Sequence, residues 1–271
     1  MNKKIIIDVH THQPRGDADR ELPAEESARR LLEEMDLFGV AISGILGRVQ
    51  PGQSVEEMRE SIRYTHDVAR AASDRLYGMV YIDPSAPAEI IREELDHYLQ
   101  TPYFRGIKIE RDVNCRDKRM DVVMEKAIEH NVPVLHHTWY VNTWSLSESA
   151  IAGQVGRSEP DDIAVLAKRF PEARILMAHL EGSGIRGVLD VADLPNVWID
   201  TSGSQPFTGT VEFAVETIGS KRVLFGSDLM GRGLESQLGR IYGANLAEED
   251  LQNILYRNAQ EMFQIKGDRL S

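Results

Sequence analysis

The sequence predicts an α/β protein that folds as a single (β/α)8 TIM barrel over residues 1–271. Short apolar runs rich in β-branched residues alternate with segments of helical periodicity, which is typical of parallel strands joined by helices. The runs are almost continuously apolar, as expected for strands covered on both faces. Eight such runs over about 250 residues match one closed barrel. An open doubly wound sheet fits less well, because no glycine-rich dinucleotide loop follows the first run.

The expected elements follow in a regular order, and no linker rich in Pro, Gly or Ser divides them into two domains. We expect strands at residues 4–10, 40–46, 76–82, 105–110, 132–137, 174–180, 196–202 and 222–228. We expect helices at residues 54–73, 87–99, 117–131, 160–171 and 246–263. Ser54 and Glu57 have the spacing of a capping box, which marks the start of the first of these helices. Asn131, just before Pro133, is a stop signal for the third.

The composition argues against several kinds of partner. The formal net charge is −12, from 43 acidic and 31 basic residues, which argues against a nucleic acid as the main partner. Cys115 is the only cysteine, so an internal disulfide is excluded and a reducing compartment is favoured. The apolar run at residues 5–7 is shorter than the roughly 7–15 residues of a signal peptide or the about 20 of a membrane helix. We therefore expect a cytoplasmic protein without a membrane partner.

Polar residues close almost every expected strand. His10 and His12 end the first strand and share one face of it, because side chains two apart on a strand point the same way. The ends of the later strands carry Lys108, Glu110, His136, His137, His179, Asp200 and Asp228. Active sites of such barrels lie at the carboxyl ends of the strands, so these side chains are expected around one mouth. Several imidazoles and a carboxylate predict a divalent metal ion, with zinc expected first and manganese, iron or nickel as alternatives.

The fifth expected strand ends in two adjacent histidines, and only one of them is expected in the site. Neighbouring residues on a strand face opposite ways. His137 lies one residue nearer the strand end and shares its parity with Trp139, so His137 is the predicted ligand. His136 is then expected to face the helix layer or the adjoining loop.

The ordered motifs resemble those of the amidohydrolase superfamily, and more closely its amidohydrolase-related branch of hydrolases and decarboxylases. The motifs are DVHTH, RGIKIE, PVLHHT, MAHLEG, WIDTSG, VLFGSD and NILYRNAQEMF, which together span nearly the whole chain. The resemblance implies metal ligation by His10, His12, His137 and Asp228. It implies that His179 is a further ligand or a catalytic acid, and that Asp228 doubles as the proton shuttle for a metal-bound water.

Two motifs depart from the pattern of the branch. Glu110 and Arg111 stand where the branch often has a histidine followed by proline. Lys108 is a candidate for the carboxylated lysine that bridges two metals in some members, and Glu110 can also bridge. A site with one metal ion is favoured, and these two residues keep a site with two metal ions open. Leu229 and Met230 replace an aromatic residue and a proline, which leaves the substrate pocket undefined.

Residues near the strand ends are candidates for substrate contacts or for loop packing. Trp139 either roofs a pocket or packs its loop, and Asp200 either serves the site or fixes its loop by an Asx-type bond. Arg15 and Arg48 follow the first two strands and either hold a substrate carboxylate or remain solvated. A small-molecule substrate is the expected partner, and an anionic one is an open alternative that Lys108 and Arg48 would help to hold.

The leading functional hypothesis is metal-dependent hydrolysis of a small ester, lactone or amide by an activated water. Asp228 would take the proton from that water, and His179 would stabilise the oxyanion. The main alternative is a metal-dependent decarboxylase or hydratase of a small carboxylic acid, with Lys108 and Arg48 holding the anion. A phosphoesterase with a His-x-His metal site and a barrel that binds a ligand without turnover rank lower. A homo-oligomer remains open, because the sequence does not define the oligomeric state.

Overall fold

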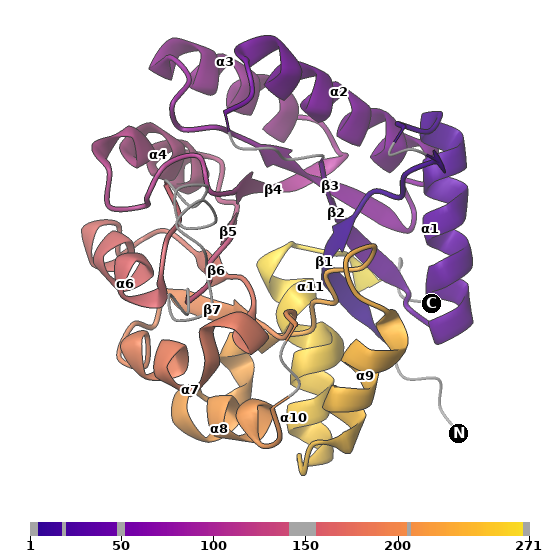
Figure 1. The fold of residues 1–271 in the computed structure, drawn as a ribbon, viewed down its shortest axis with the longest axis vertical. Coiled ribbons are helices and arrows are strands. Elements are labelled where there is room, and N and C mark those ends of the chain that lie inside the picture. Colours follow the sequence, from indigo (N-terminus) through magenta and orange to yellow (C-terminus); the bar gives the residue numbers. More distant parts are fainter. Residues whose placement is uncertain (1–4, 18–19, 48–51, 141–155, 205–206, 268–271) are drawn as a thin grey trace.

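A computed structural model describes residues 5–17, 20–47, 52–140, 156–204 and 207–267 of the chain. Parallel strands follow one another in chain order around a barrel, and helices surround it (Figure 1). The strands are β1 (Ile7–His12), β2 (Ile42–Leu46), β3 (Leu76–Tyr81), β4 (Phe104–Ile109), β5 (Val134–His136), β6 (Ile175–Met177), β7 (Val197–Asp200) and β8 (Val223–Leu224). The expected (β/α)8 TIM barrel is confirmed.

Helices alternate with the strands on the outside of the barrel. They are α1 (Ala24–Phe38), α2 (Val55–Ala71), α3 (Ala88–Leu99), α4 (Asp121–Glu129), α6 (Pro160–Arg169), α7 (Leu180–Asp190), α8 (Thr210–Ile218), α9 (Leu234–Gly243), α10 (Glu248–Gln252) and α11 (Asn258–Met262). Short 3-10 turns η2 (Lys118–Met120) and η4 (Ser220–Arg222) precede α4 and β8, and the π-helical segment η5 (Asn253–Arg257) joins α10 to α11. No described helix is both long and apolar enough to cross a membrane.

The helix signals read from the sequence act as expected at α2. The Ser54 hydroxyl accepts a hydrogen bond from the Glu57 amide at 3.3 Å, and the Ser54 amide donates to the Glu57 carboxylate at 2.8 Å. The expected helix at 246–263 is interrupted instead, because the Ile254 carbonyl accepts a hydrogen bond from the Phe225 amide of the barrel at 2.9 Å. The helix widens there into η5. Helices α1, α7, α8 and α9 are additional to those expected.

The seam between β1 and β8 closes the barrel and also builds the site. The Val9 amide donates to the Phe225 carbonyl at 3.0 Å, and the Asp228 amide donates to the His10 carbonyl at 2.8 Å. The buried Asp8 carboxylate accepts hydrogen bonds from the amide (3.0 Å) and the hydroxyl of Ser227. Burial raises the pKa of Asp8 to about 6. These bonds hold the segment after β8 directly beside the end of β1.

Two of the expected strands end three or more residues before their apolar runs do. The runs at 174–180 and 222–228 end as strands at Met177 and Leu224. His179 has φ of 69° and Asp228 has φ of 60°, so both residues leave the extended conformation. Such left-handed residues are uncommon outside glycine and often mark functional sites. The chain therefore turns at the two positions where the sequence places polar side chains.

Candidate metal centre and active site

Three side chains converge at the seam between β1 and β8. Asp228 Oδ1 lies 3.2 Å from His12 Nε2 and 3.7 Å from His10 Nε2. The candidate ligand atoms of these residues all lie within 4.8 Å of one another. Burial alone would raise the pKa of Asp228, but the hydrogen bond from His12 and the charge of His10 hold it well below its usual range. The carboxylate is therefore ionised and available as a ligand.

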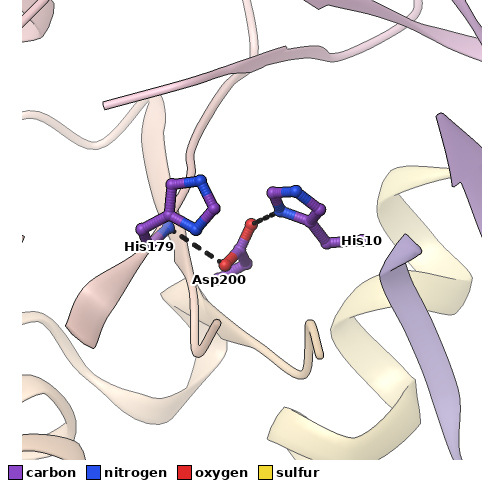
Figure 2. A group of neighbouring side chains, drawn as sticks. All are labelled: His10, His179 and Asp200. Carbon is purple, nitrogen blue, oxygen red and sulfur yellow. Dashed lines mark hydrogen bonds and ion pairs between the residues drawn. The ribbon is translucent and has the colours of Figure 1, made fainter. Parts of the chain in front are cut away.

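Asp200, at the end of β7, fixes the orientation of His10. Its Oδ2 lies 2.8 Å from His10 Nδ1, and its Oδ1 accepts the His179 amide at 3.1 Å, so one carboxylate lies between the two histidines (Figure 2). Burial would lower the pKa of His10, but the Asp200 charge outweighs it and the pKa is raised. A carboxylate that accepts the proton of one ring nitrogen leaves the lone pair of the other for a metal.

The second nitrogen of His10 fits a metal ligand. His10 Nε2 is buried and has no hydrogen-bond partner within the described structure, although the residue is only 1% exposed. An unpaired polar atom costs free energy in the core. A cation bound between His10, His12 and Asp228 would satisfy this nitrogen, so the residues present fit the ion that the sequence predicts.

A second group of side chains comes from the ends of β4, β5 and β6. His179 Nε2 lies 3.1 Å from His137 Nδ1, which lies 3.2 Å from Glu110 Oε1. Burial lowers the pKa of His179 to about 3 and holds the pKa of His137 well below its usual range. Both imidazoles are therefore neutral. The rings of His10 and His179 are 4.8 Å apart between centroids, so the two groups adjoin.

A chain of hydrogen bonds defines the tautomer of neutral His179. The Ser202 hydroxyl donates its single proton in a hydrogen bond to the Asp200 carboxylate. The same oxygen must then accept the proton on His179 Nδ1, which lies 2.8 Å away. His179 Nε2 consequently carries a lone pair. In this form His179 acts as a ligand or a base, and it serves as an acid only after taking up a proton.

Lys108 and Glu110 form a buried ion pair beneath the histidines. Lys108 is fully buried, and its Nζ lies 3.2 Å from Glu110 Oε2. Burial would raise the pKa of Glu110, but His137, Lys108 and Arg111 together lower it below its usual range. The structure therefore shows Lys108 as the partner of Glu110. Neither residue lies in the converging group of His10, His12 and Asp228.

The two histidines of β5 have different environments. His136 is fully buried, its Nδ1 donates to the His137 carbonyl at 2.7 Å, and burial lowers its pKa to about 4. His137 instead lines the cavity beside the site. The parity argument expected His137 in the mouth and His136 against the helix layer or the adjoining loop, and the structure places His137 in the cavity lining.

A cavity of about 650 Å³ opens at this end of the barrel. The residues that line it are His12, Gln13, Pro14, Arg15, Glu21, Gly47, Tyr64, Glu110, Arg111, His137, His179, Asp228, Met230 and Gly231. Trp139 is not among them. Its ring lies parallel to His137, with centroids 6.5 Å apart, and packs so closely on Gly182 that a Cβ there would lie 2.5 Å from it. Trp139 thus packs against His137 and Gly182. Arg48 lies outside the described residues.

Asp200 was a functional candidate whose role the sequence left open. Asp200 does make the expected Asx-type bond, because its Oδ1 accepts the Ser202 amide at 2.9 Å. Its bond to His10 joins residues 190 positions apart. The position of Asp200 at the end of an expected strand was the feature of the sequence that marked it as a functional candidate. Ser202 and Gln13 also contribute to the site, but no feature of the sequence marked them.

The family model of the amidohydrolases matches residues 7–265, which is nearly the whole chain. The chain belongs to the amidohydrolase family. The suspected resemblance is thereby confirmed, and so is the expectation that this amidohydrolase is an enzyme. A search among curated proteins found no match.

Solved structures share the amidohydrolase barrel at low sequence identity. The 5-carboxyvanillate decarboxylase of Sphingomonas paucimobilis superimposes with a TM-score of 0.75 at 16% identity, covering 96% of this chain and 99% of that one. A dihydroxybenzoic acid decarboxylase of Polaromonas sp. JS666, with bound manganese and the inhibitor 2-nitroresorcinol, gives 0.72 at 18%, covering 100% and 99%. The 4-oxalomesaconate hydratase of Rhodopseudomonas palustris gives 0.70 at 17%, covering 96% and 95%. At these identities the likeness shows the fold.

Proposed function

We propose that the chain is a metal-dependent decarboxylase of a small carboxylic acid. The observation that carries the proposal is a partly buried cluster of candidate cation ligands, His10, His12 and Asp228, beside a cavity with two guanidinium groups in its wall. A cation and two arginines in one cavity favour a negatively charged substrate. The solved structures with the same fold add support, because their named reactions are two decarboxylations and one hydration of carboxylic acids.

The donor set suits a divalent ion. We assign His10 Nε2, His12 Nε2 and the Asp228 carboxylate as ligands, with His137 as a fourth through the ring nitrogen that does not face Glu110 and His179. Imidazole and carboxylate accept zinc, manganese, iron and nickel alike. Manganese is the ion to test first, because the Polaromonas decarboxylase holds it, and zinc is the next.

The arginines give the cavity its anion preference. Arg15 follows β1 and Arg111 follows β4, and both line the cavity. Arg111 Nε lies 3.2 Å from Glu110 Oε1, which orients the guanidinium. Guanidinium groups bind carboxylates through paired hydrogen bonds. The cavity volume of about 650 Å³ falls in the range of small-molecule sites, roughly 300–1,000 Å³.

Decarboxylation breaks the bond between the carboxyl carbon and the carbon that carries it. Carbon dioxide leaves, the electron pair stays on the substrate, and one proton takes the place of the carboxyl group. A bound divalent ion would supply Lewis acidity that stabilises the developing negative charge. Asp228 shares a hydrogen bond with His12 and lines the cavity, so we assign it to take up one proton from solvent and deliver it to the carbon that loses carbon dioxide. His179 stays neutral and presents Nε2 to the site.

The hydrolysis that the sequence analysis placed first would use the same residues. The named reactions of the solved structures with this fold are decarboxylations and a hydration, and Arg15 and Arg111 suit a carboxylate substrate. Decarboxylation therefore replaces hydrolysis as the leading proposal.

A product assay tests the proposed reaction. The manganese-loaded protein is incubated with hydroxybenzoates and with small unsaturated dicarboxylic acids, and carbon dioxide is measured beside loss of substrate. We expect carbon dioxide in one-to-one ratio with the substrate consumed, and no carbon dioxide without a divalent ion. Hydrolysis of small lactones or esters by the same preparation, with no carbon dioxide from any acid, would contradict the proposal.

A further inference from the structure

Residues that follow β1 and β2 and a residue of helix α2 line the same cavity as the candidate metal ligands His12 and Asp228. Gln13 follows His12 in the chain, and Gly47 and Tyr64 belong to β2's end and to α2; all three line the cavity. Gln13 is 7% exposed, so its amide is held inside the protein and not at the surface. The proposed reaction assigns no role to these three residues.

The orientation of the Gln13 amide follows from its partner on α2. The Thr65 hydroxyl donates its single proton to the Ser61 carbonyl at 2.8 Å, as helix threonines often do. The Thr65 oxygen can therefore only accept from Gln13. The amide atom that lies 2.9 Å from it must be the nitrogen, Nε2, which leaves the carbonyl oxygen Oε1 on the other side.

This carbonyl oxygen has no partner. Gln13 Oε1 is buried and makes no hydrogen bond within the described structure. A buried acceptor that is left unpaired costs about 1–3 kcal/mol. Its neighbour Tyr64 cannot supply the missing proton, because the Tyr64 hydroxyl donates to the Leu22 carbonyl at 2.8 Å. Gln13, which lines the cavity, thus holds a positioned acceptor that no group of the described structure satisfies.

Gly47 makes room for this arrangement. A Cβ at position 47 would lie 2.7 Å from both the Thr65 hydroxyl and the Ser61 hydroxyl. Contacts that short would force the Thr65 side chain to move, and the bond that orients the Gln13 amide would be lost. The packing around the Thr65 hydroxyl therefore requires a glycine at position 47, directly after β2.

We infer that Gln13 is a specificity-determining residue, whose carbonyl oxygen accepts a hydrogen bond from a hydroxyl or amino group of the substrate. The inference rests on the proposed function, because it assumes that a carboxylate of the same molecule is held at the metal centre. The substrate is then a carboxylic acid that also carries a hydrogen-bond donor. Sites built to bind a polar group discriminate strongly against analogues that lack it, because the buried partner stays unpaired.

The test compares pairs of probes in binding, without turnover. Calorimetry gives the affinity of the manganese-loaded protein for each monohydroxybenzoate and for the fluorobenzoate with fluorine at the same position, which is similar in size but has no donor. We expect at least one hydroxybenzoate to bind the wild type about tenfold more tightly than its fluorine analogue, as one satisfied hydrogen bond would give. In Gln13→Met, which keeps the length of the side chain, the two should bind within about twofold of each other.

Matched variants separate orientation from general damage. Thr65→Val frees the amide and should reduce the preference, whereas Thr65→Ser keeps the hydroxyl and should preserve it. Melting temperatures report whether each variant is folded. Equal binding of all pairs by the wild type, or a preference that survives in Gln13→Met, would overturn the inference. A preference that depends on Gln13 in a protein that releases no carbon dioxide would uphold the acceptor and reject the proposed reaction.

Discussion

His10 and His179 are two buried imidazoles only 4.8 Å apart, and yet they differ in acidity. His10 Nδ1 faces the Asp200 carboxylate directly, and its pKa is raised. His179 Nδ1 faces the Ser202 hydroxyl, and burial lowers its pKa to about 3. A direct carboxylate partner thus makes one ring a strongly basic ligand. A hydroxyl between ring and carboxylate leaves the other ring neutral.

This difference between the two histidines suggests that the two sides of the barrel mouth have different functions. The side formed by β1, β7 and β8 gathers His10, His12 and Asp228 around one point. The side formed by β4, β5 and β6 pairs neutral imidazoles with the Lys108–Glu110 ion pair. We expect changes on the first side to affect metal binding most, and changes on the second side, apart from His137, to affect mainly the substrate. The predictions below test this division, starting from the largest effect.

The largest loss should follow a change at Asp228, which both holds the ion and delivers the proton. Asp228→Asn keeps the shape of the side chain but removes its charge. We expect carbon dioxide release per bound ion to fall by at least about 10²-fold, in line with the loss of a general acid or base. Rates are compared at equal metal occupancy, measured by elemental analysis. A rate within tenfold of wild type at full occupancy would remove the proposed proton carrier.

The next effect should come from the carboxylate behind His10. In Asp200→Asn the hydrogen bond can persist while the charge is lost, so His10 becomes a weaker ligand. Such partners of metal-binding histidines typically contribute 10–100-fold in affinity, and we expect a loss of about that size. Titration of the metal-free protein with manganese measures it. An unchanged affinity would show that Asp200 only fixes its loop.

A smaller effect on manganese affinity is expected when the hydroxyl that faces His179 is removed. Ser202→Ala removes the hydroxyl behind His179 and leaves the bond between Asp200 and His10 in place. Loss of one neutral hydrogen bond is worth about 0.5–1.5 kcal/mol, so manganese affinity should fall by less than about tenfold. The same titration serves as the measurement. A loss as large as that in Asp200→Asn would end the distinction between the two sides.

The smallest effect concerns a buried acid outside the histidine cluster. Asp112 accepts a hydrogen bond from the Tyr81 hydroxyl at 3.0 Å, and burial together with Asp83 raises its pKa to about 7. The folded chain keeps this proton up to about pH 7, whereas the unfolded chain releases it near 3.8. Stability should therefore fall as pH rises between those values.

Urea unfolding at pH 5 and pH 8 measures this loss. We expect Asp112→Asn, which keeps an oxygen for Tyr81 but cannot ionise, to lose less stability between the two pH values than wild type, by about 1–2 kcal/mol after solvent screening. Equal losses in the two proteins would show that Asp112 is ionised in the folded state.

The barrel was predictable because its signals are local. Continuous apolar runs and capping residues such as Ser54 act over a few positions, and parallel strands bring their carboxyl ends to one rim whatever the loops do. The grouping of His10, His12 and Asp228 follows from that rule alone. The parity of β5 likewise separates His137 from His136.

Other features depend on contacts that a single sequence does not reveal. The bond from Asp200 to His10 and the bond from Gln13 to Thr65 join distant segments. The left-handed turn at His179, which shortens β6, also depends on tertiary contacts, because Asp200 accepts the His179 amide. Trp139 shares the parity of His137, but its ring packs on Gly182 of α7 and is not among the residues that line the cavity.

The position of the ion tests the central claim most directly. Crystals of the protein soaked with manganese would give an anomalous difference map that locates the metal. The account predicts a peak bonded to His10 Nε2, His12 Nε2 and Asp228 at the seam between β1 and β8. A peak only elsewhere, for example at the surface group of Asp96, Glu129 and His130, would contradict it.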